Sequence, residues 1–300
     1  MLLTLTTQLI FMNNILVTGG KGQLGSELKE IASNYPDYNF LFTDVKTLDI
    51  TNHTAVKEFI EINNITVIIN CAAYTAVDKA EEQKDLANAI NHLAVANFAQ
   101  IAKDKNIKLI HISTDYVFDG TNHKPYVETD TPNPQSVYGK TKLDGELAMQ
   151  QINPANSIII RTSWVYSKFG NNFVKTMLRL AETRDEISVV ADQIGTPTNA
   201  ADLADAILKI FPNIDNNKVE TFHYSNQGVC SWYDFAIAIF NIKSVRLKIN
   251  PIASTKYITP AKRPFYTVLN KSLIAETYNL KIPYWGDSLI SCIVNLQQLK

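Results

Sequence analysis

The chain of 300 residues lacks both an excess of one charge and any long apolar run. Its 28 lysines and arginines face 29 aspartates and glutamates, which gives a formal net charge of −1. A near-neutral balance argues against nucleic-acid binding, which requires a basic face. A membrane-spanning helix needs roughly 20 consecutive apolar residues, and no such run is present. We therefore predict neither a nucleic-acid partner nor a membrane partner.

Cysteine is scarce as well, since Cys71, Cys230 and Cys292 are the only three and lie far apart in sequence. This excludes a disulfide framework and a metal knuckle, and it is typical of a reducing compartment such as the cytoplasm. The five histidines show no spacing of metal ligands, so we predict no zinc site. With 46% hydrophobic and 19% charged residues, the remaining composition is that of a globular protein.

The first eleven residues, 1–11, are apolar and precede the first basic residue, Lys21. A secretory signal peptide requires a positive start and a small-residue cleavage site, and this segment has neither. We predict a non-native or disordered extension, with Met12 as the natural start of the protein. A genuine hydrophobic arm is the alternative.

Short β-branched runs alternate with longer helical patterns in the first half of the chain. Strands are predicted at 15–17, 40–42, 66–72, 108–113 and 157–161, and helices at 26–33, 54–63, 85–103 and 138–152. In the third helix one apolar stripe is predicted to be buried, comprising Leu86, Ala89, Ile90, Leu93, Ala96 and Ala99. This alternation predicts an α/β fold with a Rossmann-like, doubly wound parallel sheet.

The pattern loosens after Arg161. Helices are predicted at 172–183, 200–211 and 231–240, strands at 187–191 and 220–224, and a proline-rich loop at 250–264. We therefore predict an NAD(P)-binding Rossmann domain at 12–165 and a smaller, mainly substrate-binding α/β domain at 166–300. Segments around 187–225 are candidates to return to the first domain.

Three glycines follow the first predicted strand at the spacing GxxGxxG: Gly19, Gly22 and Gly25. Such a loop lets backbone amides and a helix N-terminus approach a pyrophosphate closely. Because a strand precedes the loop and a helix follows it, nucleotide binding is favoured. The alternative is a turn that only brings a helix and a strand together.

Asp44 lies nineteen residues beyond Gly25, at the end of the second predicted strand. An acid at this position accepts hydrogen bonds from the adenosine ribose and favours NAD, whereas Lys46 is suited to a 2′-phosphate. Both NADH and NADPH therefore stay open as cofactors, and a simple turn aspartate is the alternative for Asp44. Asp49 and Ile50 resemble a pair of residues at the edge of an adenine.

Tyr138 is the only tyrosine with a lysine four residues later, and the predicted helix places Lys142 on the same face. We expect a cationic Lys142 to lower the pKa of Tyr138 from about 10 towards neutrality, which makes it a proton donor to a carbonyl oxygen. A surface pair is the alternative. Thr114 offers either a hydroxyl for that carbonyl or a turn contact. Asn91 holds water or backbone near the lysine, or is a plain helix-face residue.

Several longer segments are similar to one known family. They are TGGKGQLG (18–25), NCAAYTAVDKAE (70–81), STDYVFDG (113–120), VYGKTKLDGE (137–146), RTSWVY (161–166), GNNFVKTMLRLA (170–181), DQIGTPT (192–198) and RP (263–264). Together they resemble the extended short-chain dehydrogenase/reductase family. TAVDKAE, STDYVFDG and RTSWVY resemble its branch of dTDP-sugar reductases more specifically.

The resemblance implies a role for each matching position. Cofactor-binding residues would be Gly19, Gly22, Gln23, Leu24, Gly25, Asp44, Asp49, Ile50, Ala73, Tyr74, Thr75, Tyr138 and Lys142. Catalytic residues would be Tyr138 as the acid, Lys142 as its partner on the nicotinamide ribose, and Thr114 as an aid. Substrate-binding residues would be Thr114, Asp115, Trp164, Asn172 and Arg263.

The implied activity is reduction of the C4 keto group of dTDP-4-dehydro-β-L-rhamnose by NADPH or NADH, which gives dTDP-β-L-rhamnose. The alternatives are a reductase or epimerase of another nucleotide 4-keto-6-deoxy sugar, or a catalytically silent, nucleotide-binding regulatory subunit of the same fold. The resemblance is compatible with a homodimer. Some family members hold Mg²⁺ between subunits, but Ala201 stands where one acid is expected. We therefore predict no metal ligands.

Overall fold

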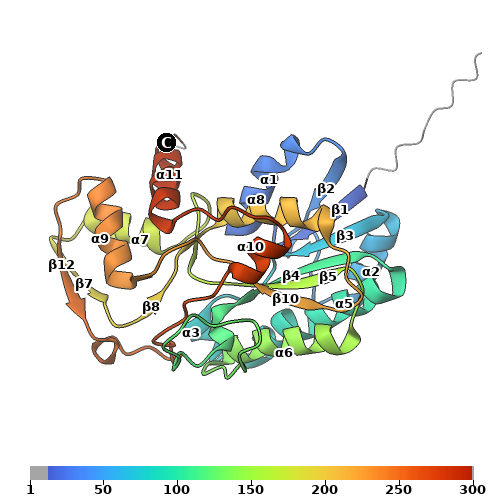
Figure 1. Ribbon diagram of the computed structural model, residues 1–300, viewed down its shortest axis with the longest axis horizontal. Coiled ribbons are helices and arrows are strands. Elements are labelled where there is room, and N and C mark those ends of the chain that lie inside the picture. The colour runs from blue at the N-terminus through green and yellow to red at the C-terminus, as the bar shows by residue number, and fades with distance from the viewer. Residues whose placement is uncertain (1–12, 299–300) are drawn as a thin grey trace, which may run out of the picture.

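A six-stranded parallel sheet lies at the centre of the computed structural model, which describes residues 13–298. Its strands are β1 (Asn13–Thr18), β2 (Tyr38–Phe42), β3 (Ile65–Asn70), β4 (Lys108–Thr114), β5 (Ser157–Thr162) and β10 (Glu220–His223). They stand in the order β10-β5-β4-β3-β1-β2, all parallel (Figure 1). The direction of winding reverses between β1 and β3, which confirms the predicted doubly wound sheet. The predicted extension at 1–11 lies outside the described residues.

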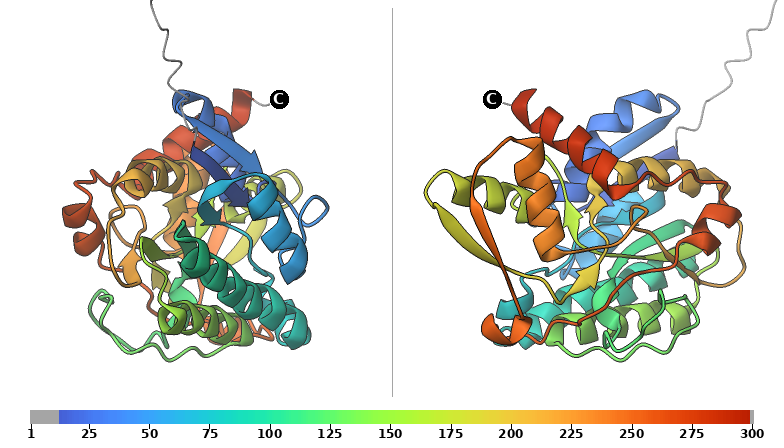
Figure 2. Two further views of the ribbon diagram at one scale, coloured as in Figure 1. Left: turned by 90° about the vertical axis from the view of Figure 1, so that its right-hand side faces the viewer. Right: turned by 60° about the vertical axis from the view of Figure 1, so that its left-hand side comes forward.

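Both faces of the sheet are covered by helices (Figure 2). One face packs against α1 (Gln23–Ile31), α8 (Ala200–Ile210) and α10 (Ser272–Thr277), and the other against α2 (His53–Ile62), α5 (Ala94–Lys105) and α6 (Val137–Ile152). In β5, Ile158 and Ile160 enter the first layer, whereas Ile159 enters the second. Continuous apolar strands are expected when both faces are buried, and this accounts for the runs seen in the sequence.

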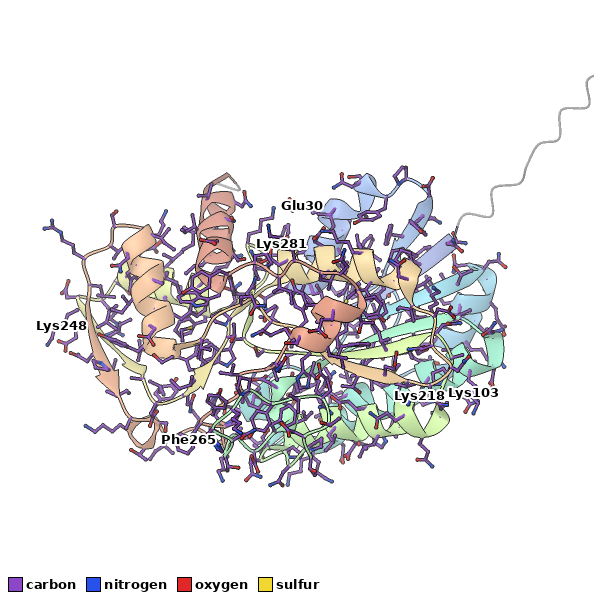
Figure 3. The ribbon with its side chains drawn as sticks, viewed as in Figure 1. Glu30, Lys103, Lys218, Lys248, Phe265 and Lys281 are labelled. Atoms are coloured by element: carbon purple, nitrogen blue, oxygen red, sulfur yellow. The ribbon has the colours of Figure 1, made fainter. Side chains whose placement is uncertain are left out.

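The second half of the chain builds a separate apolar cluster around α7 (Phe173–Ala181), α9 (Trp232–Ile242) and α11 (Trp285–Gln298). Next to it, β7 (Glu186–Val190) pairs in parallel with β12 (Lys248–Ile252). Two short pairs complete this half: β6 (Val165–Tyr166) with β9 (Thr198–Asn199), and β8 (Ile194–Gly195) with β11 (Cys230–Ser231). Figure 3 shows Lys248 of β12 at one end of the long axis, and Lys103 and Lys218 at the other. None of the described helices is long and apolar enough to cross a membrane.

Segments of the second half do pair with the first sheet, but not all of those in the predicted window. Strand β10 joins the central sheet beside β5, whereas β7 pairs only with β12. The predicted loop at 250–264 is wrong at its start, because 250–252 belong to β12. Pro251 is tolerated there because β12 has a single neighbour, so the missing N–H breaks no central ladder. The domain boundary at 165/166 stays a prediction.

The predicted helix at 85–103 is divided into α4 (Lys84–Asn88), a π-helical turn (Ala89–Leu93) and α5. Leu86 and Leu93, which we assigned to the buried stripe, are exposed. The buried face carries Asn91 and Phe98 instead. A π turn inserts one extra residue per turn, so a stripe drawn with a strict helical period drifts off the core. Three helices lie outside the segments that we predicted: α3 (Val77–Ala80), α10 and α11.

A buried ion pair ties α6 to the sheet. The guanidinium of Arg161 on β5 donates to the Glu146 carboxylate from Nε at 3.1 Å and from Nη2 at 2.6 Å. The Ser113 hydroxyl donates to the same carboxylate. Both side chains of the pair are at least 96% shielded from solvent, at 4% and 1% exposure. Loss of either partner would leave a buried charge with no counter-charge.

Glu146→Gln is therefore expected to lower the free energy of unfolding by about 3–5 kcal/mol, because the nearly isosteric amide leaves Arg161 uncompensated. Urea denaturation followed by circular dichroism measures this loss. The matched control is Lys209→Ala, which breaks the exposed pair of Lys209 with Asp205. This substitution is expected to change the free energy of unfolding by less than about 1 kcal/mol. If both substitutions lowered the free energy of unfolding equally, the predicted large contribution of the buried ion pair would be contradicted.

Candidate active site

A cavity of about 750 Å³ opens over the carboxyl ends of the central strands. Its walls come from the loops after β1, β2, β3, β4 and β5, from α6, and from Trp232 at the start of α9. In open α/β sheets, ligands bind at this edge, where the direction of winding reverses. The reversal between β1 and β3 lies under the cavity, so the fold itself selects this site.

The glycine loop forms the floor of one end of the cavity. Gly19 has a φ of +67°, and a Cβ there would lie 2.8 Å from the amide nitrogen of Ala72. A Cβ on Gly25 would lie 2.3 Å from the carbonyl oxygen of Gly19, so Gly25 supports the loop from behind and does not line the cavity. Gly22 is the N-cap of α1 and provides no side-chain cap. Gly22, Gln23 and Leu24 line the cavity, where the uncapped amides of α1 suit a pyrophosphate.

The loops after β2 line the same end of the cavity through Asp44, Asp49 and Ile50. The Asp44 carboxylate accepts hydrogen bonds from the backbone amides of Lys46 at 2.9 Å and Thr47 at 3.2 Å. It also forms an ion pair with Lys21 of the glycine loop, and the hydrogen bond from Lys21 lowers the pKa of Asp44. Asp44 is thus a turn aspartate and a wall of the cavity at once, so our two interpretations are compatible.

The segment after β3 is held in place by a helix side chain. Asn91 accepts a hydrogen bond from the Tyr74 amide at 2.9 Å and donates to the Tyr74 carbonyl at 3.1 Å and to Thr141 on α6 at 3.2 Å. Ala73 and Thr75 line the cavity, whereas the Tyr74 side chain turns away and donates to Gln83 at 2.8 Å. Of the interpretations of Asn91, the structure shows the backbone contact.

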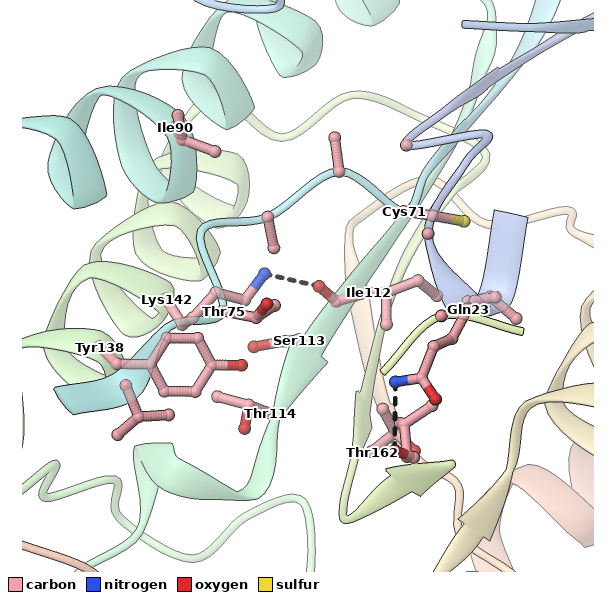
Figure 4. A pocket seen from close by; sticks show the side chains of 18 of the residues that line it. Gln23, Cys71, Thr75, Ile90, Ile112, Ser113, Thr114, Tyr138, Lys142 and Thr162 are labelled. Carbon is pink, nitrogen blue, oxygen red and sulfur yellow. Dashed lines mark hydrogen bonds between the residues drawn. The ribbon is translucent and has the colours of Figure 1, made fainter. Parts of the chain in front are cut away.

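Tyr138, Thr114 and Lys142 lie together at the other end of the cavity, where the Tyr138 ring lies beside Thr114 and Ser113 (Figure 4). The Lys142 Nζ donates to the carbonyl of Ile112 at 2.6 Å. Burial lowers the pKa of Lys142 to about 8, although the nearby Glu146 and Cys71 favour its ammonium form.

Our expected lowering of the Tyr138 pKa towards neutrality is wrong for the protein without a cofactor. Burial raises this pKa to about 12, Asp115 adds to the increase, and a side-chain hydrogen bond with Thr114 opposes it only partly. Lys142 does not counter the increase, because its Nζ donates to Ile112 and lies against His111. The phenol consequently keeps its proton at neutral pH, as a proton donor must.

The region beyond Tyr138 combines a buried carboxyl with two stacked aromatic rings. Asp115 is 2% exposed, its Oδ2 has no hydrogen-bond partner, and burial raises its pKa to about 6. Trp164 has a left-handed backbone, with a φ of +48°, and its ring stacks on Trp232 at 3.7 Å. All three residues line the cavity, which therefore holds both stacked aromatic rings and a carboxyl oxygen with no partner.

Two predicted substrate residues do not line the cavity. Asn172 caps α7 by accepting from the Lys175 amide at 3.1 Å, and it donates to the Gln23 side chain at 2.9 Å. Arg263 donates to both carboxylate oxygens of Asp78, at 3.1 and 2.7 Å. Each therefore contacts protein groups in this structure.

Several lining residues were missed by sequence reasoning, namely Lys21, Ser113, Tyr116, Asn171 and Trp232. Four of these residues lie inside the motifs quoted above, so their position was a usable signal: Lys21, Ser113, Tyr116 and Asn171. Nothing in the sequence connects Trp232 with Trp164. All three cysteines are free, and residues 13–298 hold no group of three or more His, Cys, Asp or Glu side chains suited to a metal.

Known proteins share this fold and sequence. The family model described as RmlD substrate binding domain matches residues 12–298. A dTDP-4-dehydrorhamnose reductase of Aggregatibacter actinomycetemcomitans is 41% identical over 288 residues, which cover 93% of this chain and 97% of that protein. The crystal structure of a dTDP-4-dehydrorhamnose reductase ortholog from Clostridium acetobutylicum has 45% identity and a TM-score of 0.89, over 95% of this chain and 99% of that chain.

A further solved structure, dTDP-4-dehydrorhamnose reductase from Bacillus anthracis in complex with NADP, has 39% identity and a TM-score of 0.90. It covers 95% of this chain and 99% of that chain. Similarity of this extent runs through both the glycine loop and the Tyr138 region. The chain therefore belongs to the dTDP-4-dehydrorhamnose reductase family, whose sequence model is the RmlD substrate binding domain.

Proposed function

We propose that this protein reduces the C4 keto group of dTDP-4-dehydro-β-L-rhamnose with NADPH or NADH and so produces dTDP-β-L-rhamnose. The observation that carries the proposal is the gathering of Tyr138, Thr114 and Lys142 in the same cavity as an uncapped glycine loop. A protonated phenol thereby lies near a cradle for a dinucleotide. The names of the relatives supply the substrate, because they are dTDP-4-dehydrorhamnose reductases over nearly their whole length.

The residues present fit a nicotinamide dinucleotide. The close approach of Gly19 to Ala72 leaves no room for a side chain, and the α1 amides stay available for a pyrophosphate. Asp44, Asp49 and Ile50 would hold the adenosine end, and Ala73 and Thr75 would flank the path to Lys142. When bound, the reduced nicotinamide supplies the hydride that the carbonyl carbon receives.

Tyr138 would give its proton to the carbonyl oxygen as negative charge develops there. Because burial keeps the pKa of Tyr138 at about 12, the phenol arrives at this step protonated. The Thr114 hydroxyl would hold the same oxygen in place, and the Lys142 ammonium would stabilise the charge on the tyrosine oxygen after the transfer.

The sugar would lie between Asp115 and the stacked pair Trp164–Trp232. The unpartnered Oδ2 of Asp115 suits a sugar hydroxyl, because a buried polar atom gains most from a partner. We propose that Asn172 acts indirectly, by orienting Gln23. Arg263 would reach a diphosphate only by leaving Asp78. Its guanidinium can donate two parallel hydrogen bonds to a carboxylate or to a phosphate.

We further propose a homodimer and a cytoplasmic location. The exposed Leu86, Leu93 and Leu147 on α4, the π turn and α6 supply apolar surface of the kind that a second copy would cover. The free thiols agree with a reducing compartment.

A direct assay tests the reductase. Purified protein with enzymatically prepared dTDP-4-dehydrorhamnose is expected to consume NADH or NADPH, measured by the loss of absorbance of the reduced nicotinamide. Tyr138→Phe is expected to lower kcat by about 10²–10⁴-fold, because the general acid is gone. Binding of NADPH, measured by fluorescence, should persist.

The matched control for this substitution is Tyr166→Phe. The Tyr166 hydroxyl is buried without a partner and lies outside the cavity lining, so its removal should leave turnover unchanged. Wild-type turnover in Tyr138→Phe would exclude Tyr138 as the acid. If the wild type consumes no cofactor with this sugar, another 4-keto sugar, an epimerase or a silent regulatory subunit takes its place.

Cofactor preference is expected to depend on the ion pair between Lys21 and Asp44. Lys21→Ala removes a cation that favours a 2′-phosphate and should lower kcat/KM for NADPH relative to NADH by about tenfold. Asp44→Asn keeps the turn but removes the anion, so the ratio should change in the opposite direction. The measurement is kcat/KM with each cofactor. Lys29→Ala, a nearby lysine outside the cavity lining, is the control; shifts in the same direction for both test variants would refute this assignment.

A further inference from the structure

A row of buried polar side chains crosses the central sheet and ends at Lys142. Thr18 on β1 pairs in register with Asn70 on β3, and Asn70 pairs with His111 on β4. Their side chains form one hydrogen-bonded chain, with Thr18 Oγ1 to Asn70 Oδ1 at 2.6 Å, Asn70 Nδ2 to His111 Nδ1 at 3.1 Å, and His111 Nε2 to Lys142 Nζ at 3.2 Å. All four residues are at most 1% exposed. Polar groups this deep in an apolar sheet are costly unless every one is paired.

The directions of these hydrogen bonds define one state of the row. The Thr18 hydroxyl accepts from the Ala72 amide at 3.3 Å and donates to Asn70, so the Asn70 amide nitrogen faces His111 Nδ1. A neutral imidazole that accepts at Nδ1 carries its proton on Nε2, which faces Lys142. An ammonium group has no lone pair, so this arrangement is satisfied only when Lys142 is a neutral amine.

When every hydrogen bond of the row runs in the opposite direction, the row matches the ammonium form of Lys142. With the Asn70 amide turned over, its oxygen accepts from His111 Nδ1–H, and its nitrogen donates to the Thr18 hydroxyl. Nε2 of His111 then accepts from the ammonium of Lys142. Hydroxyl, carboxamide and imidazole can each donate or accept, so every nitrogen and oxygen of the row keeps at least one hydrogen-bond partner when the row reverses. The bond from Lys142 to the Ile112 carbonyl persists in both states.

We propose that His111 is a positioning residue that pairs with Lys142 in both of its protonation states, so that Lys142 can return a proton to the Tyr138 oxygen after each reduction. The proposal rests on the proposed reductase function. In the reaction the carbonyl carbon gains a hydride from NAD(P)H, and the carbonyl oxygen gains the Tyr138 proton. The resulting phenolate takes a proton from the Lys142 ammonium, and the amine regains one from water.

Of the titratable groups around this end of the cavity, Cys71, Tyr138 and His111 do not exchange protons near neutral pH. Burial raises the pKa of the Cys71 thiol to about 12 and that of Tyr138 to about 12. The Glu146 carboxylate is paired with Arg161, whose Nη2 lies 2.6 Å from Oε2. Burial and the Lys142 charge lower the pKa of His111 well below its usual value, so the imidazole stays neutral. Lys142, with a pKa of about 8, is therefore the group that titrates.

Nitrogen NMR of protein labelled with ¹⁵N-histidine tests the row without substrate or cofactor. The sequence has five histidines, and the spectrum of His111→Gln identifies the signal of His111. We expect His111 to stay neutral and to pass from the Nδ1–H tautomer below pH 8 to the Nε2–H tautomer above it. In Lys142→Met, this change should disappear. A single tautomer at every pH in the wild type would overturn the proposal.

The pH profile of kcat tests the role of His111 in turnover. We expect kcat to fall at high pH as Lys142 loses its proton, and this fall is the basic limb of the profile. His111→Phe removes the acceptor for the ammonium and should shift this basic limb down by about one pH unit. Asn70→Asp fixes an acceptor towards Nδ1, favours the ammonium form and should shift the limb up. His111→Gln, which keeps a donor and an acceptor, should restore it towards the wild-type position.

These outcomes separate the two proposals. If the wild type shows no turnover with the dTDP-sugar, the reductase function fails, while the tautomer change still reports on the His111 row. If the wild type turns over and neither His111→Phe nor Asn70→Asp moves the limb, the role of His111 is refuted. Should His111→Phe fail to fold, Asn70→Asp and the tautomer measurement decide alone.

Discussion

Helix α6 lies against the turn after β4 and against the π-helical turn (Ala89–Leu93) at a distance that only glycine permits, and the geometry of the site depends on these contacts. A Cβ on Gly139 would lie 2.2 Å from the Tyr116 carbonyl oxygen, and a Cβ on Gly145 would lie 2.2 Å from that of Asn91. Between and beside these glycines, Tyr138, Lys142 and Glu146 follow at intervals of four residues on one face of the helix. Because the helix backbone is so near, all three polar heads enter the protein interior.

Each of these heads needs a partner, and the sheet provides a different one for each. Glu146 is paired with Arg161, Lys142 with the Ile112 carbonyl and His111, and Tyr138 with Thr114. Desolvation then moves two pKa values in opposite directions, with Tyr138 raised to about 12 and Lys142 lowered to about 8. A proton on the lysine is therefore held less tightly than one on the tyrosine oxygen. The same close packing that buries the pair thus supports the proposed return of a proton from Lys142 to the Tyr138 oxygen.

Much of this fold follows from local patterns in the sequence. The β-branched run at 157–161 predicts strand β5, and the pattern at 138–152 predicts helix α6, each to within one residue. The glycine spacing and the Tyr138–Lys142 interval also point to residues that line one cavity, namely Gly19, Gly22, Tyr138 and Lys142, whereas Gly25 supports the loop from behind. These features succeed because each is determined by residues within a few positions of one another.

The failures share the opposite property, since distant partners decide them. Asn172 and Arg263 read as ligand-binding residues, yet Gln23 and Asp78 are 149 and 185 residues away in sequence and occupy their polar groups here. The exposed Leu86 and Leu93 depend on a π turn that packs Asn91 inward. The pKa of Tyr138 depends on how much water the folded chain excludes, which no i,i+4 spacing reveals. His111 gains its contact with Asn70 from strand register and its contact with Lys142 from the packing of α6, neither of which the sequence displays.

The two ends of the cavity differ in the same way, and the difference bears on how specificity is built. The end that we propose for the dinucleotide has as its floor the backbone of one continuous loop, which runs from Gly19 into the N-terminus of α1. The end that we propose for the sugar is lined by side chains from widely separated segments, Asp115 after β4, Trp164 after β5 and Trp232 at α9. A backbone cradle tolerates most substitutions outside its glycines, whereas side chains on separate loops change independently. Recognition of the sugar is therefore the property that this fold can alter while it keeps its cofactor and its acid.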